Sequence, residues 1–352
     1  MMSELAEELE RLRIYADPSG LPYAGAGPMA TGDMRSTPED FCVVEHSGLT
    51  ATGAGEHLLL RVKKTSQNTR WVAKRLAELA GVPYRAVSYA GMKDRHAVTE
   101  QWFGMHLPGR IQPVFEVPEG EGIELLEAVW HDRKLRPGQL SYNEFRLLLR
   151  NCDVNDLEEL DSGLRAIGAA GVPNYFGAQR FGHQQGNLFI LRDIRALASI
   201  GREQRAFALS ALRGALFNGY LAQRVMDGTW SDGLAGDVEI SDRPRGVAEH
   251  DESVFTAERL PAGLMWGKQC QAARDEAALC ERAFYGQFPL VTQLLEQAGS
   301  RASRRVLRAR VGNLSWHLGG EELELNFALG PGSYATMVLR ECLRINDKGA
   351  SG

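Results

Sequence analysis

The sequence predicts an α+β fold in which a helix-rich domain interrupts a strand-rich one. Its length of 352 residues exceeds the size at which a single hydrophobic core usually stops growing. Short β-branched and apolar runs dominate the first 150 residues, longer helical patterns fill the middle, and a strand pattern returns at 321–329. We therefore expect one discontinuous domain of residues 1–170 and 306–352, and an inserted domain of residues 171–305.

The first half of the chain alternates strand patterns with two amphipathic helices. We expect strands at 39–46, 56–62, 86–91, 100–107, 123–131 and 142–150. The helical pattern at 68–81 can begin at a cap formed by Asn68 or Thr69. Leucine and isoleucine at three- and four-residue spacing predict a second helix at 154–171.

The second half contains mainly helical patterns and turns. Residues 203–226 and 271–297 are expected to be helical, with an acidic interval rich in Gly, Asp and Pro between them. The arginines of "RASRRVLRAR" (301–310) recur at helical spacing. In "GPGSYATMVLRE" (330–341) a tight turn leads into a helix that Ser333 can cap.

Composition and motifs exclude several protein classes. The N-terminal "MMSELAEELERLR" is acidic and helical in pattern, so it lacks the basic and apolar segments of a secretory signal. No apolar run reaches the roughly 18 residues of a membrane-spanning helix. The five cysteines are scattered without a C-x-x-C pair, which favours reduced thiols and a cytoplasmic location. No motif requires a metal or another cofactor, and no obligatory protein partner is evident.

Charge is distributed unevenly along the chain, although the net charge is only −5. Residues 56–78 and 301–310 are basic, whereas residues 227–252 hold eight acids against two arginines. A polyanion would be attracted to the first two segments and repelled by the third. The candidate phosphate-binding side chains are Lys63, Lys64, Arg70, Arg180, Arg304, Arg305 and Arg308. A solvated basic surface without a ligand would explain the same residues.

The stretch "SYAGMKDRHAVTEQWF" (88–103) places a single carboxylate, Asp94, between Lys93 and Arg95. A solvated surface turn would account for this triplet. Neighbouring cations also favour the ionised form of a carboxylate, and an ionised carboxylate is suited to attack an electrophilic carbon. Glycosidase chemistry with two carboxylates is unsupported, because the nearby Glu100 falls inside the following strand pattern.

Another dense motif, "GVPNYFGAQRFG" (171–182), supports two interpretations. Phe176 and Phe181 are typical of aromatic side chains that fill a domain interface. The polar residues Asn174, Gln179 and Arg180 could instead line a surface that holds phosphates.

These motifs together resemble the TruD family of tRNA pseudouridine synthases. The segments "GEHLLLRVKKTSQNTRWVA", "YAGMKDRHAVTEQWF", "GVPNYFGAQRFG" and "GPGSYATMVLRE" occur in the family's order, and the resemblance extends over about residues 36–345. It implies a pseudouridine synthase catalytic core around a long mixed or antiparallel sheet, interrupted by the helix-rich TRUD domain. It also implies that uridine 13 in the D-arm of tRNA is isomerised to pseudouridine.

The resemblance further implies site residues. Asp94 occupies the position of the family's catalytic aspartate, and Phe41, Asn143, Phe145 and Tyr334 those of substrate-contacting residues. The flipped uridine would stack on these rings. Asp94 would either attack carbon 1′ or abstract the carbon 2′ proton, and the sequence leaves both routes open.

The flanking cations of the same motif, Lys93 and Arg95, are expected to keep Asp94 charged or to bind adjacent phosphates. Two other functions remain as alternatives. The chain could be a catalytically idle RNA-binding protein of the same fold, or a carboxylate-dependent nucleoside glycosidase.

Overall fold

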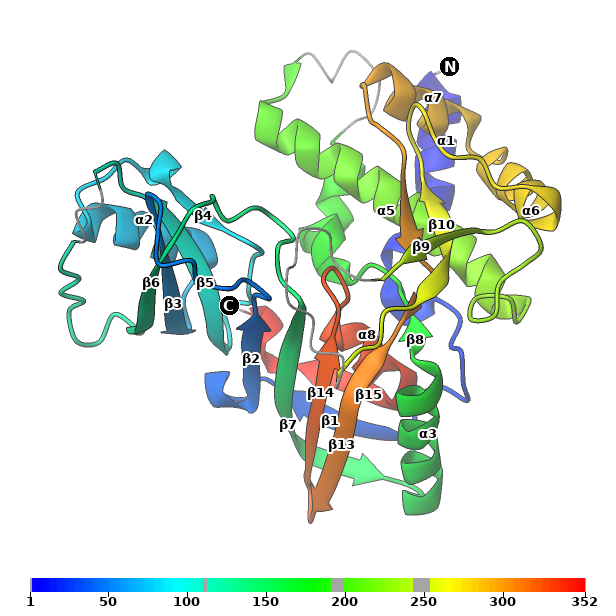
Figure 1. Cartoon of the computed structure of the whole chain (residues 1–352). Helices are drawn as coiled ribbons and strands as arrows, with labels where there is room; N and C mark the ends of the chain where they lie inside the picture. The colour runs from blue at the N-terminus through cyan, green and yellow to red at the C-terminus, as the bar shows by residue number, and fades with distance from the viewer. Residues whose placement is uncertain (1, 110–112, 191–198, 243–253, 352) are drawn as a thin grey trace.

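The computed structural model describes residues 2–109, 113–190, 199–242 and 254–351, and within them a ten-stranded sheet forms the centre of the molecule (Figure 1). Its strands are β1 (Ala30–Met34), β2 (Phe41–His46), β3 (His57–Thr65), β4 (Val87–Tyr89), β5 (Val98–His106), β6 (Ile123–His131), β7 (Tyr142–Val154), β13 (Val311–Gly319), β14 (Glu322–Leu329) and β15 (Leu343–Asp347). The order along the sheet is β13-β14-β7-β2-β5-β3-β6, with β1, β15 and β4 attached beside this path. Parallel and antiparallel pairs both occur, so the mixed sheet expected of an α+β fold is confirmed.

One end of the sheet forms a separate lobe, which we call the α2 lobe (residues 57–131). Helix α2 (Thr69–Leu79) packs on β3, β4 and β5, and Leu60, Val72 and Phe103 are fully buried between them (Figure 1). The Asn68 side chain accepts a hydrogen bond from the Arg70 amide at 2.8 Å, which confirms the expected N-cap.

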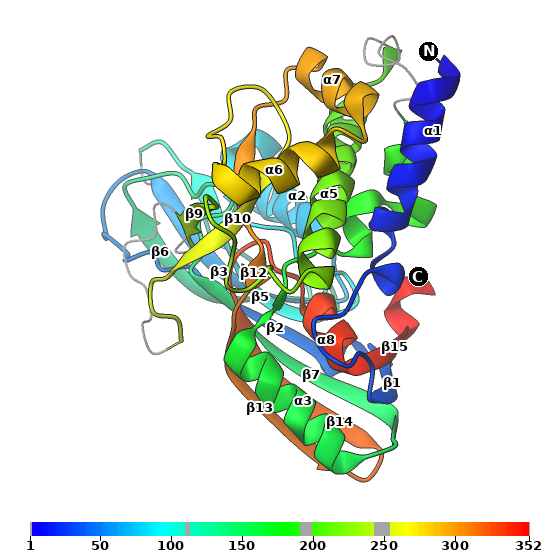
Figure 2. The ribbon, with the colours of Figure 1, turned by 90° about the vertical axis from the view of Figure 1, so that its right-hand side faces the viewer.

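The other end of the sheet carries α3 (Leu157–Ala170) and α8 (Ala335–Cys342) on one face (Figure 2). Leu164 on α3 and Leu339 on α8 are buried in one core with Leu325 of β14. Asp156 caps α3 by accepting hydrogen bonds from the amides of Glu158 and Glu159.

The inserted segment is organised around the long helix α5 (Arg202–Met226). Around it lie β8 (Val172–Pro173), β9 (Val238–Ser241), β10 (Arg259–Met265), α6 (Asp275–Tyr285), α7 (Pro289–Gln297), β11 (Ser303–Val306) and β12 (Arg308–Ala309). The strands β9, β10 and β11 form a small antiparallel sheet, and β12 pairs with β8, so the two ends of the insertion lie side by side.

The N-terminal helix α1 (Met2–Arg13) belongs to the core of the inserted segment, which differs from the expected grouping of residues 1–170. Leu9 and Leu12 are buried beside α5 and α7. The Glu8 carboxylate accepts hydrogen bonds from the amides of Leu290 and Val291, so it satisfies free amides at the N-terminal end of α7.

Three local expectations are wrong. Residues 301–310 form the short strands β11 and β12, with Leu307 fully buried at their junction. The helical pattern at 271–297 divides into α6 and α7, because Pro289 cannot continue a hydrogen-bonded helix and instead starts a new one. Ser333 does not cap α8, since Tyr334 occupies the N-cap position and no side chain caps the helix.

The described residues include no helix with the length and apolar character needed to cross a bilayer.

Candidate active site

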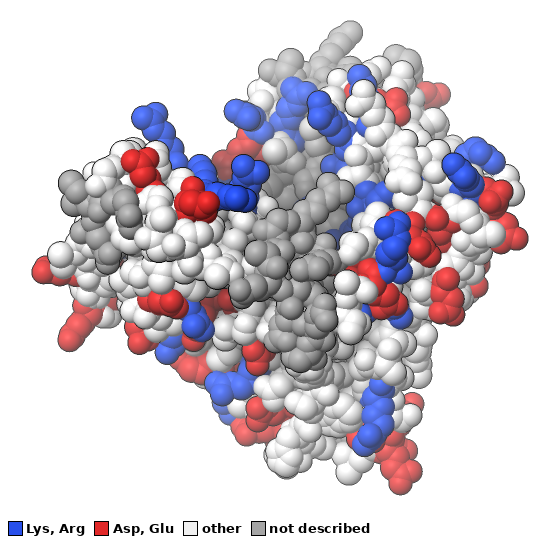
Figure 3. All heavy atoms as spheres, viewed as in Figure 1, with Lys and Arg blue, Asp and Glu red and all other residues white. Residues whose placement is uncertain are grey.

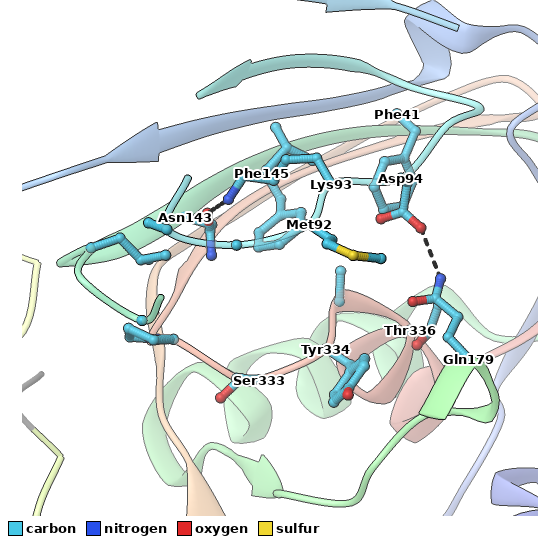
Figure 4. A pocket seen from close by; sticks show the side chains of 18 of the residues that line it. Phe41, Met92, Lys93, Asp94, Asn143, Phe145, Gln179, Ser333, Tyr334 and Thr336 are labelled. Atoms are coloured by element: carbon cyan, nitrogen blue, oxygen red, sulfur yellow. Dashed lines mark hydrogen bonds between the residues drawn. The ribbon is translucent and has the colours of Figure 1, made fainter. Parts of the chain in front are cut away.

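A cleft of about 270 Å³ lies where the α2 lobe, the central sheet and the inserted segment meet. Asp94 lies at its edge, in the turn that joins β4 to β5 (Figure 4). Phe41, Asn143 and Phe145 reach the cleft from β2 and β7, and the turn before α8 contributes Tyr334. The structure therefore brings together the catalytic and substrate-contacting residues expected from the sequence, from four distant segments of the chain.

Buried polar side chains hold the backbone of the Asp94 turn. Gln101 donates to the Gly91 carbonyl at 3.2 Å, and the Lys93 amide donates to Thr69 Oγ1 at 3.0 Å. Lys64 Nζ donates to the Asp94 carbonyl at 2.7 Å. The Thr69, Gln101 and Lys64 side chains are almost completely buried, so this support is shielded from water and fixes the direction of the carboxylate.

Two donors reach the carboxylate of Asp94 itself. Arg35 Nη1 lies 3.3 Å from Asp94 Oδ1, and Gln179 Nε2 donates to the same oxygen at 2.8 Å (Figure 4 shows the Gln179 bond). The Asp94 side chain is 28% exposed, so a substrate can still reach it. Both donors hold the carboxylate in a fixed rotamer.

Arg35 was not identified by sequence reasoning. Burial lowers the pKa of its guanidinium, but hydrogen bonds and charges from Asp347 and Asp94 outweigh burial, so the pKa is raised overall. Its Nε donates to Asp347 Oδ1 at 2.9 Å, and its guanidinium lies 5.3 Å from the centre of the Phe41 ring. No local motif marks Arg35, because its partners lie 59 and 312 residues away.

Neither Lys93 nor Arg95 contacts the Asp94 carboxylate, although the sequence suggested that they flank it. Lys93 Nζ pairs with the fully buried Glu45 at 2.8 Å and donates to Asn143 Oδ1, so it compensates Glu45 rather than Asp94. Arg95 is exposed, and its side chain has no ion-pair partner among the residues that the structure describes. The cation next to the carboxylate is Arg35.

Aromatic rings form two sides of the cleft. Phe41 contacts Phe145 edge to face at 6.2 Å, and Phe145 stacks on Phe327 at 5.3 Å. Phe41 is only 2% exposed, so these rings form a fixed floor. Tyr334 lies across the cleft from them, supported edge to face by Phe176 at 6.2 Å (Figure 4).

The comparisons with known proteins agree with this site. A family model described as tRNA pseudouridine synthase D (TruD) matches residues 21–194 and 191–342. The chain belongs to this family. The family resemblance inferred from the motifs is thereby confirmed.

Relatives of this family cover nearly the whole chain. The tRNA pseudouridine synthase D of Stutzerimonas stutzeri is 41% identical over 333 residues, covering 92% of this chain and 96% of the relative. That of Aeromonas salmonicida is 40% identical over 337 residues, with coverages of 93% and 95%. A crystal structure from Methanosarcina mazei, itself assigned to tRNA pseudouridine synthase D, superposes with a TM-score of 0.62 at 19% identity, covering 91% of this chain and 95% of the other, which supports the fold.

The basic residues expected to contact phosphates fall into two groups in this family member. Four of them form ion pairs with carboxylates: Lys63 with Glu124, Arg70 with Glu203, Arg304 with Glu281, and Arg308 with Glu258. Lys64 instead donates a hydrogen bond to the backbone carbonyl of Asp94. Lys64 is fully buried, which contradicts a role at the surface. Arg304 is also buried in its ion pair, and Arg308 is mostly so. Arg180 and Arg305 lie near the cleft and have no carboxylate partner among the described residues.

Proposed function

We propose that this chain isomerises a uridine of tRNA to pseudouridine, with Asp94 as the catalytic carboxylate. The observation that carries the proposal is the position of Asp94, held by Arg35 and Gln179 at the edge of an aromatic cleft. Family membership supports the substrate and the reaction. The finer assignment is uridine 13 in the D-arm, acted on in the cytoplasm.

The reaction needs one ionised carboxylate and a cleft that holds the uracil. The bond between N1 and carbon 1′ breaks, the uracil turns, and carbon 5 bonds to carbon 1′. The proton leaves carbon 5 and N1 gains one, so the product is an isomer of the substrate. Asp94 begins this sequence either by attacking carbon 1′ or by removing the carbon 2′ proton.

The residues around Asp94 support separate parts of the reaction. Arg35 orients the carboxylate, and Phe41, Phe145 and Tyr334 supply the apolar surfaces that receive a flipped base. Asn143 lies in the same cleft, where its amide can hydrogen-bond the uracil edge while Lys93 fixes its orientation.

The proposal divides the chain into a catalytic domain and an inserted TRUD domain at residues 171–305. The packing of α1 on α5 and α7 supports placing the first residues with the TRUD domain rather than with the catalytic domain.

A tritium-release assay tests the function. Wild-type protein incubated with tRNA that carries tritium at carbon 5 of its uridines should release one equivalent of tritium, and mapping should place the pseudouridine at position 13. A tRNA with cytidine at that position should release none. Release of free uracil would indicate the glycosidase, and tight binding without tritium release would indicate an idle RNA-binding protein.

A further inference from the structure

Three arginines of the inserted segment lie half-buried without a carboxylate partner. Arg180, Arg213 and Arg305 form no ion pair with any acid among the described residues, although each is partly removed from water. Burial lowers the pKa of each guanidinium, that of Arg305 to about 10. The positive charge of Arg180 adds to the effect of burial on Arg213 and on Arg305, so Arg180 lies close to both.

Three arginines buried elsewhere in the described part of the chain are each compensated by an acid. Arg224 pairs with Asp237 at 2.7 Å, Arg340 with Glu341 at 2.6 Å, and Arg304 with Glu281. An uncompensated buried charge is costly, and proteins usually pair it. Arg180, Arg213 and Arg305 lack this compensation among the described residues, and an anionic ligand would supply it.

This cluster borders the active-site cleft. The guanidinium carbons of Arg180 and Arg305 lie 4.6 and 4.0 Å from the centre of the Phe176 ring. Phe176 supports Tyr334, which lines the cleft. Gln179, the residue before Arg180, donates the hydrogen bond to Asp94. The segment 179–180 thus contacts the catalytic carboxylate with one residue and presents a cation with the next.

The three arginines are not equally available to a ligand. Arg213 donates to the carbonyls of Trp266, Met265 and Arg301 and holds β10 and β11 against α5. Arg305 likewise donates through Nε and Nη2 to Asn174 and Gly332, which leaves its Nη1 without a hydrogen bond among the described residues.

Arg180 is the most available of the three. Among the described residues, its Nε donates a long hydrogen bond of 3.4 Å to the Ser210 carbonyl, and the Tyr334 hydroxyl is a second polar neighbour. Neither neighbour is a carboxylate, so Arg180 can turn its two terminal nitrogens to an anion. Arg305 and Arg213 add positive potential behind it.

We propose that Arg180, reinforced by Arg305, binds the RNA backbone phosphate adjacent to the nucleotide whose base enters the cleft. This inference rests on the proposed function. A flipped nucleotide carries a phosphate on each side, and a guanidinium can bind two phosphate oxygens at once. Lys and Arg side chains lie on both sides of the notch between the α2 lobe and the inserted segment (Figure 3), so a polyanion that enters this notch meets cations on each side.

The test compares Arg180→Gln, Arg180→Lys and the control Arg165→Gln. The control also removes one positive charge, from an exposed pair with Asp161 on α3. Binding is measured with tRNA that carries a single uncharged methylphosphonate at each phosphate around the target uridine in turn. Pseudouridine formation by the wild type on unmodified tRNA is measured in parallel, because its absence would reject the proposed function independently of this site.

The wild type should lose about tenfold in affinity at one flanking position, as expected for one charge-assisted contact. The Arg180→Gln variant should bind unmodified tRNA about tenfold more weakly than the wild type does. A methylphosphonate at the sensitive position should not weaken binding by this variant any further. The variant's plot of log affinity against log salt should flatten by about one unit. Arg180→Lys should keep the wild-type slope, and Arg165→Gln should keep both slope and affinity.

Two results would overturn the proposal. One is that the wild type forms pseudouridine normally, but its affinity for tRNA falls by the same small factor at every methylphosphonate position. The other is an Arg180→Gln variant whose loss adds to that of each methylphosphonate. Because the position scan uses the wild type alone, it stays decisive even if the Gln variant folds poorly.

Discussion

The two walls of the cleft differ in whether their cations have acidic partners. On the side of the central sheet and the α2 lobe, each described cation that reaches the cleft has an acidic partner: Arg35 contacts Asp94 and Asp347, and Lys93 contacts Glu45. On the side of the inserted segment, Arg180 and Arg305 lie behind the lining residues, where they contact rings, carbonyls and amides but no described carboxylate.

This difference indicates two tasks. An ion-paired wall is already organised before substrate arrives, and such preorganisation is what a catalytic carboxylate needs. Cations without an acidic partner are neutralised only when an anion binds. We infer that the central sheet fixes the chemistry and that the inserted segment positions the RNA. The hydrogen bond from Gln179 to Asp94 joins the two walls.

The largest effect is expected at the centre of the paired wall. Asp94→Asn keeps the shape of the side chain but removes the charge that the reaction uses, so pseudouridine formation should fall at least about a thousandfold. Binding of tRNA and the melting temperature should remain close to wild type. Tritium release gives the rate. Residual turnover within about tenfold of wild type would assign the catalysis to another group.

The buried pair of the same wall should dominate its stability. Lys93→Met leaves Glu45 charged and fully buried, so the free energy of unfolding should fall by about 3–5 kcal/mol. Adding Glu45→Gln to Lys93→Met should recover much of the loss, because the unpaired charge disappears. Urea unfolding followed by circular dichroism measures both. A double variant no more stable than the single one would show that Lys93 acts mainly through packing.

Sequence reasoning predicted the residues that line the cleft and missed those that hold Asp94 in place. Asp94, Phe41, Asn143 and Tyr334 lie in compact motifs, and the structure places them in one cleft. Local patterns also predicted strands such as β6, since alternation and β-branched residues are local properties.

What the sequence could not show depends on distant contacts. Gln179 meets Asp94 across 85 residues, and no spacing rule connects them. The error at 301–310 has a related cause: its arginines fit a helical period, but burial of Leu307 and pairing of Arg308 with Pro173 favour strands. Tertiary contacts outweighed the local pattern.

The support beneath Asp94 should make stability depend on pH. Burial lowers the pKa of Lys64 from 10.5 to about 8 in the folded protein. The unfolded chain therefore binds more protons between these values, so the free energy of unfolding should rise with pH across this window. Lys64→Met removes this titration. The wild type should gain about 3 kcal/mol relative to the variant between pH 8 and 10.5.

Urea unfolding at several pH values within that window measures the gain. Parallel curves for the two proteins would mean that Lys64 keeps its ordinary pKa in the fold. The comparison also tests function, because loss of the bond to the Asp94 carbonyl should lower the maximal rate more than it weakens tRNA binding.

The smallest of these effects concerns Tyr334, the ring that faces the paired wall from the other side. If the flipped uracil stacks on it, Tyr334→Ala should lose about 1–3 kcal/mol of transition-state binding, the usual contribution of base–aromatic stacking. Tyr334→Phe keeps the ring, so its rate should stay near wild type. The ratio of kcat to KM for tRNA measures both variants.

The matched substrate is a tRNA whose target nucleotide lacks its base. Binding of this tRNA should be the same for wild type and Tyr334→Ala, because no ring then enters the cleft. Tyr334 also rests on Phe176, so a purely structural role predicts a different pattern. In that case Tyr334→Ala would melt at a lower temperature and turn over normally per folded molecule. That outcome would reassign Tyr334 from the substrate to the core and leave uracil stacking to Phe41 and Phe145.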